Sequence, residues 1–326
     1  MKLKRRIAGQ KVGAVGLGCM SFGGVYGATT EGESHACLAA AIDLGITHWD
    51  VAEIYGMGIS ERAIGAYLAQ TNAPVTLATK AGIYPKPTRH FRNDAEALRR
   101  SLEGSLERLG RDSVDLFYIH RREADRPIEE VMETLAGFIA EGLIGAIGLS
   151  EVAPATLRRA HAVHPVAAVQ SEYSLWTRQP ELGMIQTCAE LGVTFVAFSP
   201  VGRGIFADRF PRREDFPPED FRQANPRFVE PNFSANKAAI APFQDWCRAR
   251  GWSTAATAVA WTLAQGDHIL PIPGTRTAAN LRDLVRADDI VLSAQDLAEI
   301  EAILPAGFAH GDRYSDAQYG GVERYC

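Results

Sequence analysis

Residues 146–174, AIGLSEVAPATLRRAHAVHPVAAVQSEYS, decide the fold class, because two short apolar runs flank one amphipathic segment. The runs AIGLSE (146–151) and VAAVQSEYS (166–174) have the length and character of buried strands, whereas PATLRRAHAVH (154–164) has the apolar spacing of a helix. Successive strands that are joined through a helix pair in parallel. This stretch therefore predicts a strand, a helix and a second, parallel strand.

The same alternation runs through the whole chain. Strand-like runs are found at residues 12–18, 47–52, 75–82, 114–121, 146–151, 166–174, 193–200 and 268–275. Helical patterns follow them at residues 31–45, 60–70, 94–110, 128–142, 154–164, 181–192 and 277–287. One further helix is expected beyond the long loop that follows residues 193–200. Eight strand–helix pairs in a chain of 326 residues favour a closed (β/α)8 TIM barrel over an open doubly wound sheet. We expect a single domain spanning residues 1–326.

Four segments extend beyond these pairs. Residues 2–15, KLKRRIAGQKVGAV, predict a β-hairpin with its turn near Gly9, and we expect this hairpin to plug the bottom of the barrel. Residues 199–236 are too long and irregular for a plain connector, which indicates a functional or a disordered loop. The helix predicted at 293–304 and the aperiodic tail 305–326 are expected to fold over the barrel mouth.

Composition favours a small-molecule partner. The 34 basic and 39 acidic residues give a net charge of −5, which argues against nucleic acid or an anionic membrane as the main partner. No apolar run is long enough for a membrane helix, and the basic start is followed by a Gly-broken stretch unlike an export signal. The 5 cysteines form no CxxC pair, which fits a reducing, cytoplasmic location. These are Cys19, Cys37, Cys188, Cys247 and Cys326.

Polar residues at the carboxyl ends of the predicted strands are the candidates for catalysis, because active sites of these barrels lie there. The candidates are Asp50, Tyr55, Lys80, His120, Ser150, Glu151, Gln170 and Glu172. A single Lys or His at a strand end is more often a solvated rim residue. The joint pattern of an acid, a phenol, a lysine and a histidine nevertheless points to one site.

Four of these residues have complementary chemistry. An ammonium group beside a phenol lowers the phenol's pKa, so Lys80 would make Tyr55 a usable general acid. Asp50 would pair with Lys80, and His120 would orient a substrate oxygen. Such a site protonates an oxyanion as it forms and has no obvious nucleophile or metal.

At this point the chain resembles the aldo-keto reductase family over essentially its full length, and is similar to soluble, microbial NADPH-dependent members. The motifs that carry the resemblance are GLGCMSFGG (16–24), LGITHWDVAEIYGMGISERAIG (44–65), Thr79–Lys80, SLERLGRDSVDLFYIH (105–120), GLSE (148–151), VQSEYS (169–174), FSPVGRG (198–204) and PIPGTRTAANL (271–281). The resemblance implies a catalytic tetrad of Asp50, Tyr55, Lys80 and His120 that reduces carbonyl compounds with NADPH, NADH being the less favoured cofactor.

The resemblance also implies cofactor contacts. Ser150 and Gln170 would hold the nicotinamide carboxamide, and Phe198 would stack on the ring. Glu151 stands where the family more often has Asn, and its role is open. Further contacts are implied near the pyrophosphate for Ser199, Pro200, Val201, Gly202, Arg203 and Gly204, near the 2′-phosphate for Gly274, Thr275 and Arg276, near the adenosine for Asn280 and Asp283, and beside the first loop for Gly23. Arg276 favours NADPH, although it could also be a solvated loop cap.

Two weaker motifs have simpler explanations. GLGCMS, from Gly16, imitates a dinucleotide-binding fingerprint, but no helix follows and the third glycine is missing. His161 and His164 share one predicted helix face, and without a third ligand a surface pair is the better interpretation.

Substrate contacts and the reaction class leave alternatives open. Candidates that follow strands are Tyr26, Tyr84, Arg89, Phe91, Arg121 and Trp176. Arg121 could attract an anionic or highly oxygenated carbonyl compound, or it could form a salt bridge. The main alternative function is an NADPH-binding regulatory or redox-sensing subunit with little turnover. A hydrolase using Asp50 with Glu172 is a third possibility, which Lys80 beside Asp50 argues against. The oligomeric state is not predicted.

Overall fold

The fold is built on an eight-stranded parallel sheet in a computed structural model that describes residues 4–325. Gly16 N donates to Pro271 O at 2.9 Å and Gly18 N to Pro273 O at 3.1 Å, so the first strand meets the last. The strands are β3 (Leu17–Gly18), β4 (His48–Asp50), β5 (Thr76–Ala81), β8 (Leu116–Ile119), β9 (Ile147–Ser150), β10 (Val166–Glu172), β11 (Thr194–Phe198) and β12 (Ile269–Ile272). The predicted (β/α)8 barrel is confirmed.

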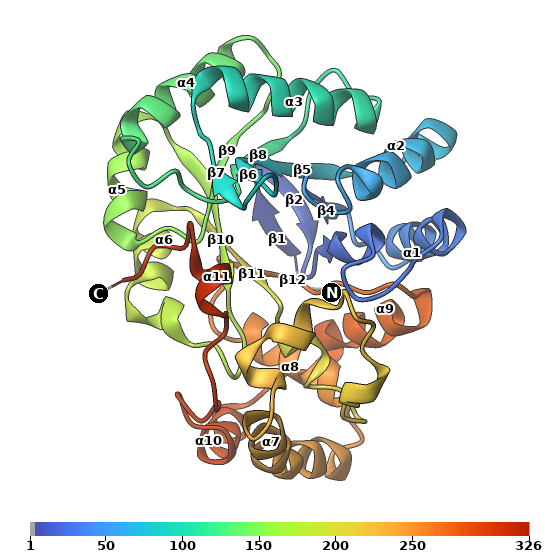
Figure 1. The fold of residues 1–326 in the computed structure, drawn as a ribbon. Coiled ribbons are helices and arrows are strands. Elements are labelled where there is room, and N and C mark those ends of the chain that lie inside the picture. Colours follow the sequence, from blue (N-terminus) through green and yellow to red (C-terminus); the bar gives the residue numbers. More distant parts are fainter. Residues whose placement is uncertain (1–3, 326) are drawn as a thin grey trace.

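Helices form a ring outside the strands (Figure 1). They are α1 (Glu31–Asp43), α2 (Ile59–Thr71), α3 (Ala95–Leu109), α4 (Ile128–Ala140), α5 (Pro154–Val163), α6 (Met184–Leu191), α8 (Thr254–Leu263) and α9 (Ala278–Val285). In α3, Leu98 and Leu102 lie four positions apart on the buried face. Asp94 caps its first turn by accepting from Ala97 N, and Gly110 ends it in the left-handed conformation at φ 62°.

The connection from β11 to β12 differs from the prediction. It contains two helices, α7 (Asn232–Ala249) and α8, instead of one. α8 is buried along almost its whole length, so its sequence TAATAVAWTL lacks the polar face that marks a surface helix. α7 packs against α10 (Ala294–Ile303) outside the ring, and α10 corresponds to the helix predicted at 293–304.

The N-terminal hairpin consists of β1 (Lys4–Ile7) and β2 (Gln10–Gly13), paired antiparallel around Gly9 at φ 77°. Ile7 and Val12 are each 1% exposed and join a cluster inside the barrel with Tyr118 and Leu270. The expected plug is therefore present. The predicted first strand, 12–18, is wrong in extent: its beginning belongs to the hairpin and only Leu17–Gly18 pairs in the barrel.

Loops and the end of the chain cover the carboxyl ends of the strands. The long loop folds as short 3₁₀ turns, η3 (Gly202–Gly204), η4 (Arg213–Asp215), η5 (Phe221–Ala224) and η6 (Pro226–Phe228). Other short elements are η1 (Met20–Gly23), η2 (Gln179–Leu182), η7 (Arg286–Asp289) and the small hairpin of β6 (Ile83–Tyr84) and β7 (His90–Phe91). Residues 305–325, here named the C-terminal segment, carry α11 (Asp316–Tyr319) across the mouth (Figure 1). Within the described residues, every helix is too short or too polar to cross a membrane.

Candidate active site

Strands β4, β5 and β10 bring three polar side chains together at the barrel mouth. Lys80, fully buried on β5, forms an ion pair with Asp50 at the end of β4 and donates to Val51 O at 2.9 Å. The second Asp50 oxygen accepts from Gln170 Nε2 at 2.8 Å. Tyr55, in the loop between β4 and α2, has its hydroxyl 3.4 Å from Lys80 Nζ. The predicted neighbours Asp50, Lys80 and Tyr55 are therefore adjacent.

The charges at this cluster have opposing effects on Tyr55. Burial of the phenol raises the pKa of Tyr55, the Lys80 ammonium lowers it, and Asp50 raises it again, with a net increase. Lys80 lowers the pKa of Tyr55 as expected, but desolvation outweighs the ammonium, so the pKa stays above its ordinary value. Burial also opposes the charge on Lys80, but Asp50 more than offsets this and raises the pKa of Lys80. Lys80 thus stays an ammonium at neutral pH.

His120 follows β8 and lines the same cavity at 8% exposure. Its ring meets that of Tyr55 edge to face, with 5.8 Å between the ring centroids. Burial and the nearby charges of Arg121, Lys80 and Arg89 lower the pKa of His120 well below its ordinary value. The imidazole is therefore neutral at pH 7 and can donate one hydrogen bond without adding a charge.

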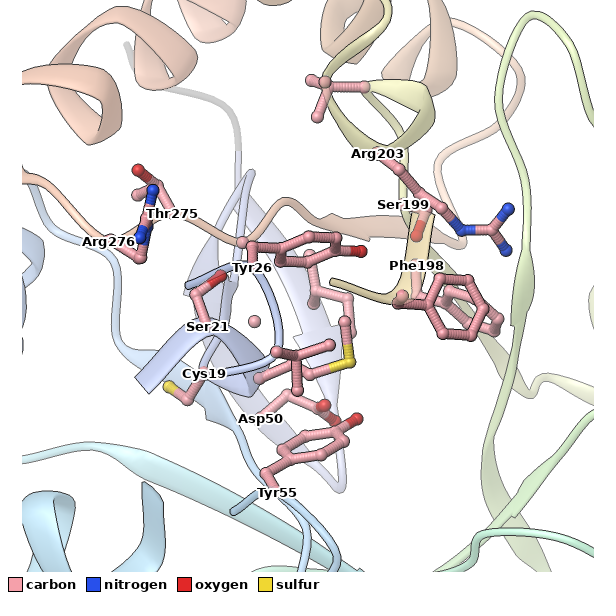
Figure 2. A pocket seen from close by; sticks show the side chains of 18 of the residues that line it. Cys19, Ser21, Tyr26, Asp50, Tyr55, Phe198, Ser199, Arg203, Thr275 and Arg276 are labelled. Atoms are coloured by element: carbon pink, nitrogen blue, oxygen red, sulfur yellow. The ribbon is translucent and has the colours of Figure 1, made fainter. Parts of the chain in front are cut away.

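A cleft of about 840 Å³ starts at this cluster and extends across the barrel mouth. Figure 2 shows Asp50 and Tyr55 at one end, Thr275 and Arg276 at another, and Phe198 across from Tyr26. The cofactor contacts expected from the sequence that line the cleft are Ser150, Gln170, Phe198, Ser199, Val201, Arg203, Gly204, Gly274, Thr275, Arg276, Asn280 and Asp283. Lys80 is fully buried and does not line the cleft.

The end of the cleft that contains Arg276 is lined by the beginning of α9. Asp283 accepts from Ser253 Oγ at 2.5 Å, and Leu284 adds an apolar wall. Arg276 is exposed and donates only a long hydrogen bond, 3.3 Å, to Ala28 O. A cleft of this volume, with a solvent-facing guanidinium at one end and a proton donor at the other, fits a dinucleotide that carries a 2′-phosphate.

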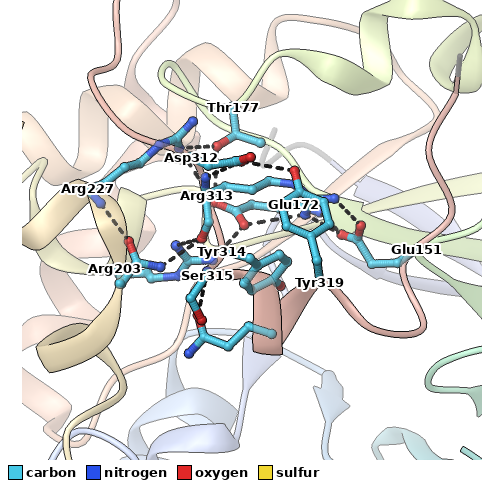
Figure 3. A network of polar contacts seen from close by, with 12 residues as sticks. Glu151, Glu172, Thr177, Arg203, Arg227, Asp312, Arg313, Tyr314, Ser315 and Tyr319 are labelled. Atoms are coloured by element: carbon cyan, nitrogen blue, oxygen red, sulfur yellow. Dashed lines mark hydrogen bonds and ion pairs between the residues drawn. The ribbon is translucent and has the colours of Figure 1, made fainter.

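Glu151, predicted among the cofactor contacts, does not line the cleft. Its carboxylate accepts from Arg313 Nη1 at 3.0 Å and Nη2 at 2.5 Å, and also from Glu172 N at 2.9 Å. Figure 3 shows Glu151 and Arg203 on opposite sides of a buried network that contains Arg313, with Glu172 between them. Glu151 therefore anchors the C-terminal segment and is not a cleft residue.

Three predicted glycine or proline contacts also lie outside the cleft lining. A Cβ on Gly23 would come within 2.5 Å of the Tyr55 carbonyl carbon, so Gly23 allows its loop to pack directly on the Tyr55 backbone. Gly202, at φ 57°, lies against Trp176 and Phe206, and Pro200 is buried. Pro200 and Gly202 belong to the loop that carries Ser199, Val201 and Gly204, whose own atoms line the cleft.

Only some of the predicted substrate contacts line the cleft. Tyr26, Arg89 and Arg121 line the cleft. Tyr84 does not, because its hydroxyl turns toward α3 and lies 3.1 Å from Ser101 Oγ. Trp176 does not either.

Trp176 is 3% exposed and packs edge to face on Phe206 and Phe228. Phe91, whose ring lies under the Arg89 guanidinium at 5.4 Å, is partly buried outside the lining.

Residues that the sequence did not single out complete the cleft. Tyr314 and Gln318 come from the C-terminal segment, and Phe221 and Arg222 come from the long loop. The aromatic and arginine content of both segments was the available signal, but none of these four residues lies directly at a strand end. Arg222 is held by Asp220 at 2.7 Å, and its guanidinium lies 5.1 Å from the centre of the Tyr26 ring.

The residues of the alternative hydrolase site and of the histidine pair are engaged in other contacts. Glu172, the second acid of the hydrolase hypothesis, is 1% exposed and forms an ion pair with Arg203 at 2.6 Å, while Asp50 is paired with Lys80. Neither carboxylate is therefore placed to act as a general acid. His161 Nδ1 accepts from Val166 N at 3.2 Å, and His164 Nδ1 lies 3.2 Å from Pro165 O.

Comparisons with known proteins agree with this geometry. The family model described as "Aldo/keto reductase family" matches residues 14–305. Aldo-keto reductase yakc [NADP(+)] of Schizosaccharomyces pombe is 38% identical over 318 residues, which covers 95% of this chain and 94% of that protein.

Two solved structures are similar as well. The glycerol dehydrogenase AKR11B4 from Gluconobacter oxydans has a TM-score of 0.84 and 28% identity over 92% of this chain and 94% of its own. An aldo/keto reductase from Klebsiella pneumoniae, in complex with NADP and acetate, has a TM-score of 0.76 and 26% identity over 97% and 99% of the two chains. The fold, the residues at the barrel mouth and these matches lead to one conclusion: this chain belongs to the aldo/keto reductase family.

Proposed function

We propose that this protein reduces aldehyde or ketone carbonyls to alcohols with NADPH, and catalyses the reverse oxidation with NADP+. The observation that carries the proposal is the Tyr55 hydroxyl, 3.4 Å from the Lys80 ammonium, at one end of a cleft that reaches Arg276. The names of the fission-yeast relative and of the Klebsiella complex, which both include NADP, support the cofactor. All the relatives described above are named as reductases or dehydrogenases, which favours turnover over a regulatory role.

In this proposal each residue of the tetrad has one task. The bound nicotinamide supplies the hydride that reduces the carbonyl carbon. Tyr55 gives its hydroxyl proton to the carbonyl oxygen, and Lys80 stabilises the phenolate that remains. Asp50 keeps Lys80 charged, and neutral His120 donates to the same oxygen. Each preorganised donor to the developing oxyanion, here Tyr55 and His120, lowers the activation free energy by on the order of 3 kcal/mol.

The cofactor would lie along the residues already placed in the cleft. Ser150 and Gln170 are proposed to contact the carboxamide, and Phe198 the nicotinamide ring, since all three line the cleft near Asp50. Gln170 already donates to Asp50, so it links the tetrad to the cofactor end. Ser199, Val201, Arg203 and Gly204 are proposed for the pyrophosphate, and Asn280 and Asp283 for the adenosine.

Preference for NADPH over NADH is proposed to depend on Arg276. Phosphate is bound by a guanidinium through charge-assisted hydrogen bonds, and the exposed Arg276 has the donors for them. Titration of the purified protein, followed by quenching of Trp fluorescence, should show NADPH binding at least about tenfold tighter than NADH. Arg276→Ala should remove most of this difference, whereas Arg282→Ala, an exposed arginine on α9 outside the cleft lining, should not.

Two outcomes of the titration are decisive. Tight NADPH binding justifies a screen of aldehydes and ketones that follows the nicotinamide absorbance. Binding of neither nucleotide contradicts the proposed function.

We also propose a small-molecule substrate, a cytoplasmic location and a single domain. A net charge of −5 supports a small-molecule carbonyl substrate over nucleic acid or an anionic membrane. Buried, free Cys19, Cys37, Cys188 and Cys247 support a reducing cytoplasm, while Cys326 lies outside the described residues. We propose that residues 1–326 act as one domain, since the hairpin, loops and C-terminal segment all pack on the same barrel.

A further inference from the structure

The substrate end of the cleft contains two guanidinium groups, those of Arg89 and Arg121. Two other cleft arginines are neutralised: Arg203 pairs with Glu172 at 2.6 Å, and Arg222 pairs with Asp220 at 2.7 Å. In residues 4–325, Arg89 and Arg121 form hydrogen bonds to neutral oxygens but no ion pair. Two neighbouring cations without bound carboxylates are costly to hold together, so their placement needs an explanation.

Arg121 is the more enclosed of the two, at 6% exposure. Its Nη1 donates to His120 O at 2.6 Å and to Ser150 Oγ at 3.1 Å, and its Nη2 donates to Tyr314 OH at 3.4 Å. Its buried Nε has no hydrogen-bond partner within the described chain. These contacts fix the guanidinium directly beside His120 and leave its charge without a counter-ion.

Arg89 enters the cleft from the turn between β6 and β7. Its Nη1 donates to the backbone oxygens of Gln318 at 3.1 Å and Ala317 at 3.5 Å, and its guanidinium lies over the Phe91 ring. Partial burial and the charge of Arg121 lower the pKa of Arg89. Arg89 therefore lies close enough to Arg121 to feel its charge, in a loop that adjoins the one carrying Arg121.

Nearby carboxylates are already engaged. Asp50 is bound by Lys80 and Gln170. Glu151, whose pKa is influenced by Arg121, is held by two hydrogen bonds from Arg313. Within residues 4–325, both carboxylates are thus bound by other cations, and neither forms an ion pair with Arg89 or Arg121.

We propose that Arg89 and Arg121 bind a carboxylate on the substrate, so that the preferred substrates are carbonyl compounds that also carry an acid group. This inference rests on the proposed function and names its substrate class. In the reaction the carbonyl carbon gains the hydride, its oxygen gains the Tyr55 proton, and NADPH becomes NADP+. The carboxylate is unchanged and serves to orient the carbonyl toward Tyr55 and His120.

The test compares two aldehydes that differ in charge, 4-carboxybenzaldehyde and its methyl ester, at saturating NADPH. We expect kcat/KM for the acid to exceed that for the ester at least about tenfold, and this ratio to fall with added salt. Arg89→Met and Arg121→Met should each lower the ratio about tenfold or more. Arg92→Met is the matched control, because Arg92 lies on the same loop, is paired with Asp94 at 2.9 Å and is outside the cleft lining.

A binding measurement separates this inference from the proposed function. Calorimetric titration of the NADP+ complex with 4-(hydroxymethyl)benzoate should show binding that Arg89→Met weakens and Arg92→Met does not. Equal efficiencies for acid and ester, or a ratio unchanged in both cleft variants, overturn the inference and leave carbonyl reduction standing. Arg89-dependent binding of the acid without turnover of either aldehyde supports the anion site but contradicts the proposed reaction.

Discussion

Tyr55 is the residue on which the chemistry depends, and its surroundings act on it in opposite directions. Burial raises the pKa of its phenol, and the Lys80 ammonium limits that rise. A phenol with a raised pKa is fully protonated at neutral pH, which suits proton donation during reduction. In the proposed reaction, Lys80 would therefore act less by ionising Tyr55 beforehand than by stabilising the phenolate after the proton has left.

This balance predicts different pH profiles for the two directions. Reduction requires the protonated phenol, so its kcat should be level through neutral pH and fall only as the pH approaches the raised pKa of Tyr55. Alcohol oxidation requires the phenolate, so its kcat should rise with pH over the same range. His120, with its lowered pKa, should add no transition near its ordinary pKa. Steady-state rates at saturating cofactor in both directions check this expectation.

Tyr55→Phe tests the assignment within the same experiment. The variant should lose about three orders of magnitude in kcat, while its affinity for NADPH, measured by fluorescence titration, stays near that of the unchanged protein. Turnover close to that of the unchanged protein would remove Tyr55 from the role of general acid.

At the scale of elements, the C-terminal segment forms a wall of the cleft because a buried ion pair holds it. Tyr314 and Gln318 face the cleft, and their neighbour Arg313 binds Glu151 just beyond the end of β9. Burial opposes ionisation of Glu151, but Arg313 more than offsets it and lowers the pKa of Glu151. The stabilisation is thus present above the ordinary pKa of a glutamate and is lost as the pH falls through the lowered value.

Glu151→Gln should therefore destabilise the protein by about 3 kcal/mol, because buried Arg313 would lose its closest carboxylate and keep only the longer ion pair with Glu172 at 3.5 Å. Urea unfolding measures this loss, and limited proteolysis should show earlier cleavage in the C-terminal segment. The matched control is Arg158→Gln, which breaks an exposed ion pair with Glu190 and should cost less than about 1 kcal/mol. Equal losses for both variants would show that the buried pair does not anchor the segment.

At the scale of the whole molecule, the barrel is closed at its two ends by different means. The hairpin of β1 and β2 fills the bottom with Ile7 and Val12, while the long loop and the C-terminal segment surround the cleft at the mouth. The bottom is thus an apolar seal, and the mouth carries the polar and charged groups.

Ile7→Ala should lower the free energy of unfolding by about 3 kcal/mol, since it leaves a cavity in a fully packed barrel. Its kcat should be unaffected, because the hairpin lies at the end opposite the cleft. Ile59→Ala, at a position 50% exposed, is the control and should cost less than about 1 kcal/mol. Denaturant unfolding monitored by Trp fluorescence gives both values. A loss for Ile7→Ala no larger than that of the control would mean that the hairpin is not part of the barrel core.

The sequence by itself determined the barrel, the hairpin and the strand ends that carry Asp50, Lys80 and His120. These features depend on local patterns, since apolar runs and helical spacing specify elements within a few residues. It did not separate α7 from α8, because α8 is buried on nearly all sides and shows no polar face.

Only the tertiary structure decided the features that join distant segments. Glu151 meets Arg313 across 162 positions, and Arg121 meets Tyr314 across 193. The raised pKa of Tyr55 has the same origin, because desolvation depends on the packing of distant segments around the hydroxyl. Strand periodicity carries no record of such contacts, since neither the tail nor the long loop has a repeating pattern that fixes its position. The sequence therefore predicted which strand ends carry the tetrad residues. The packing of the loops over these residues decided their burial, the pKa of Tyr55 and the walls of the cleft.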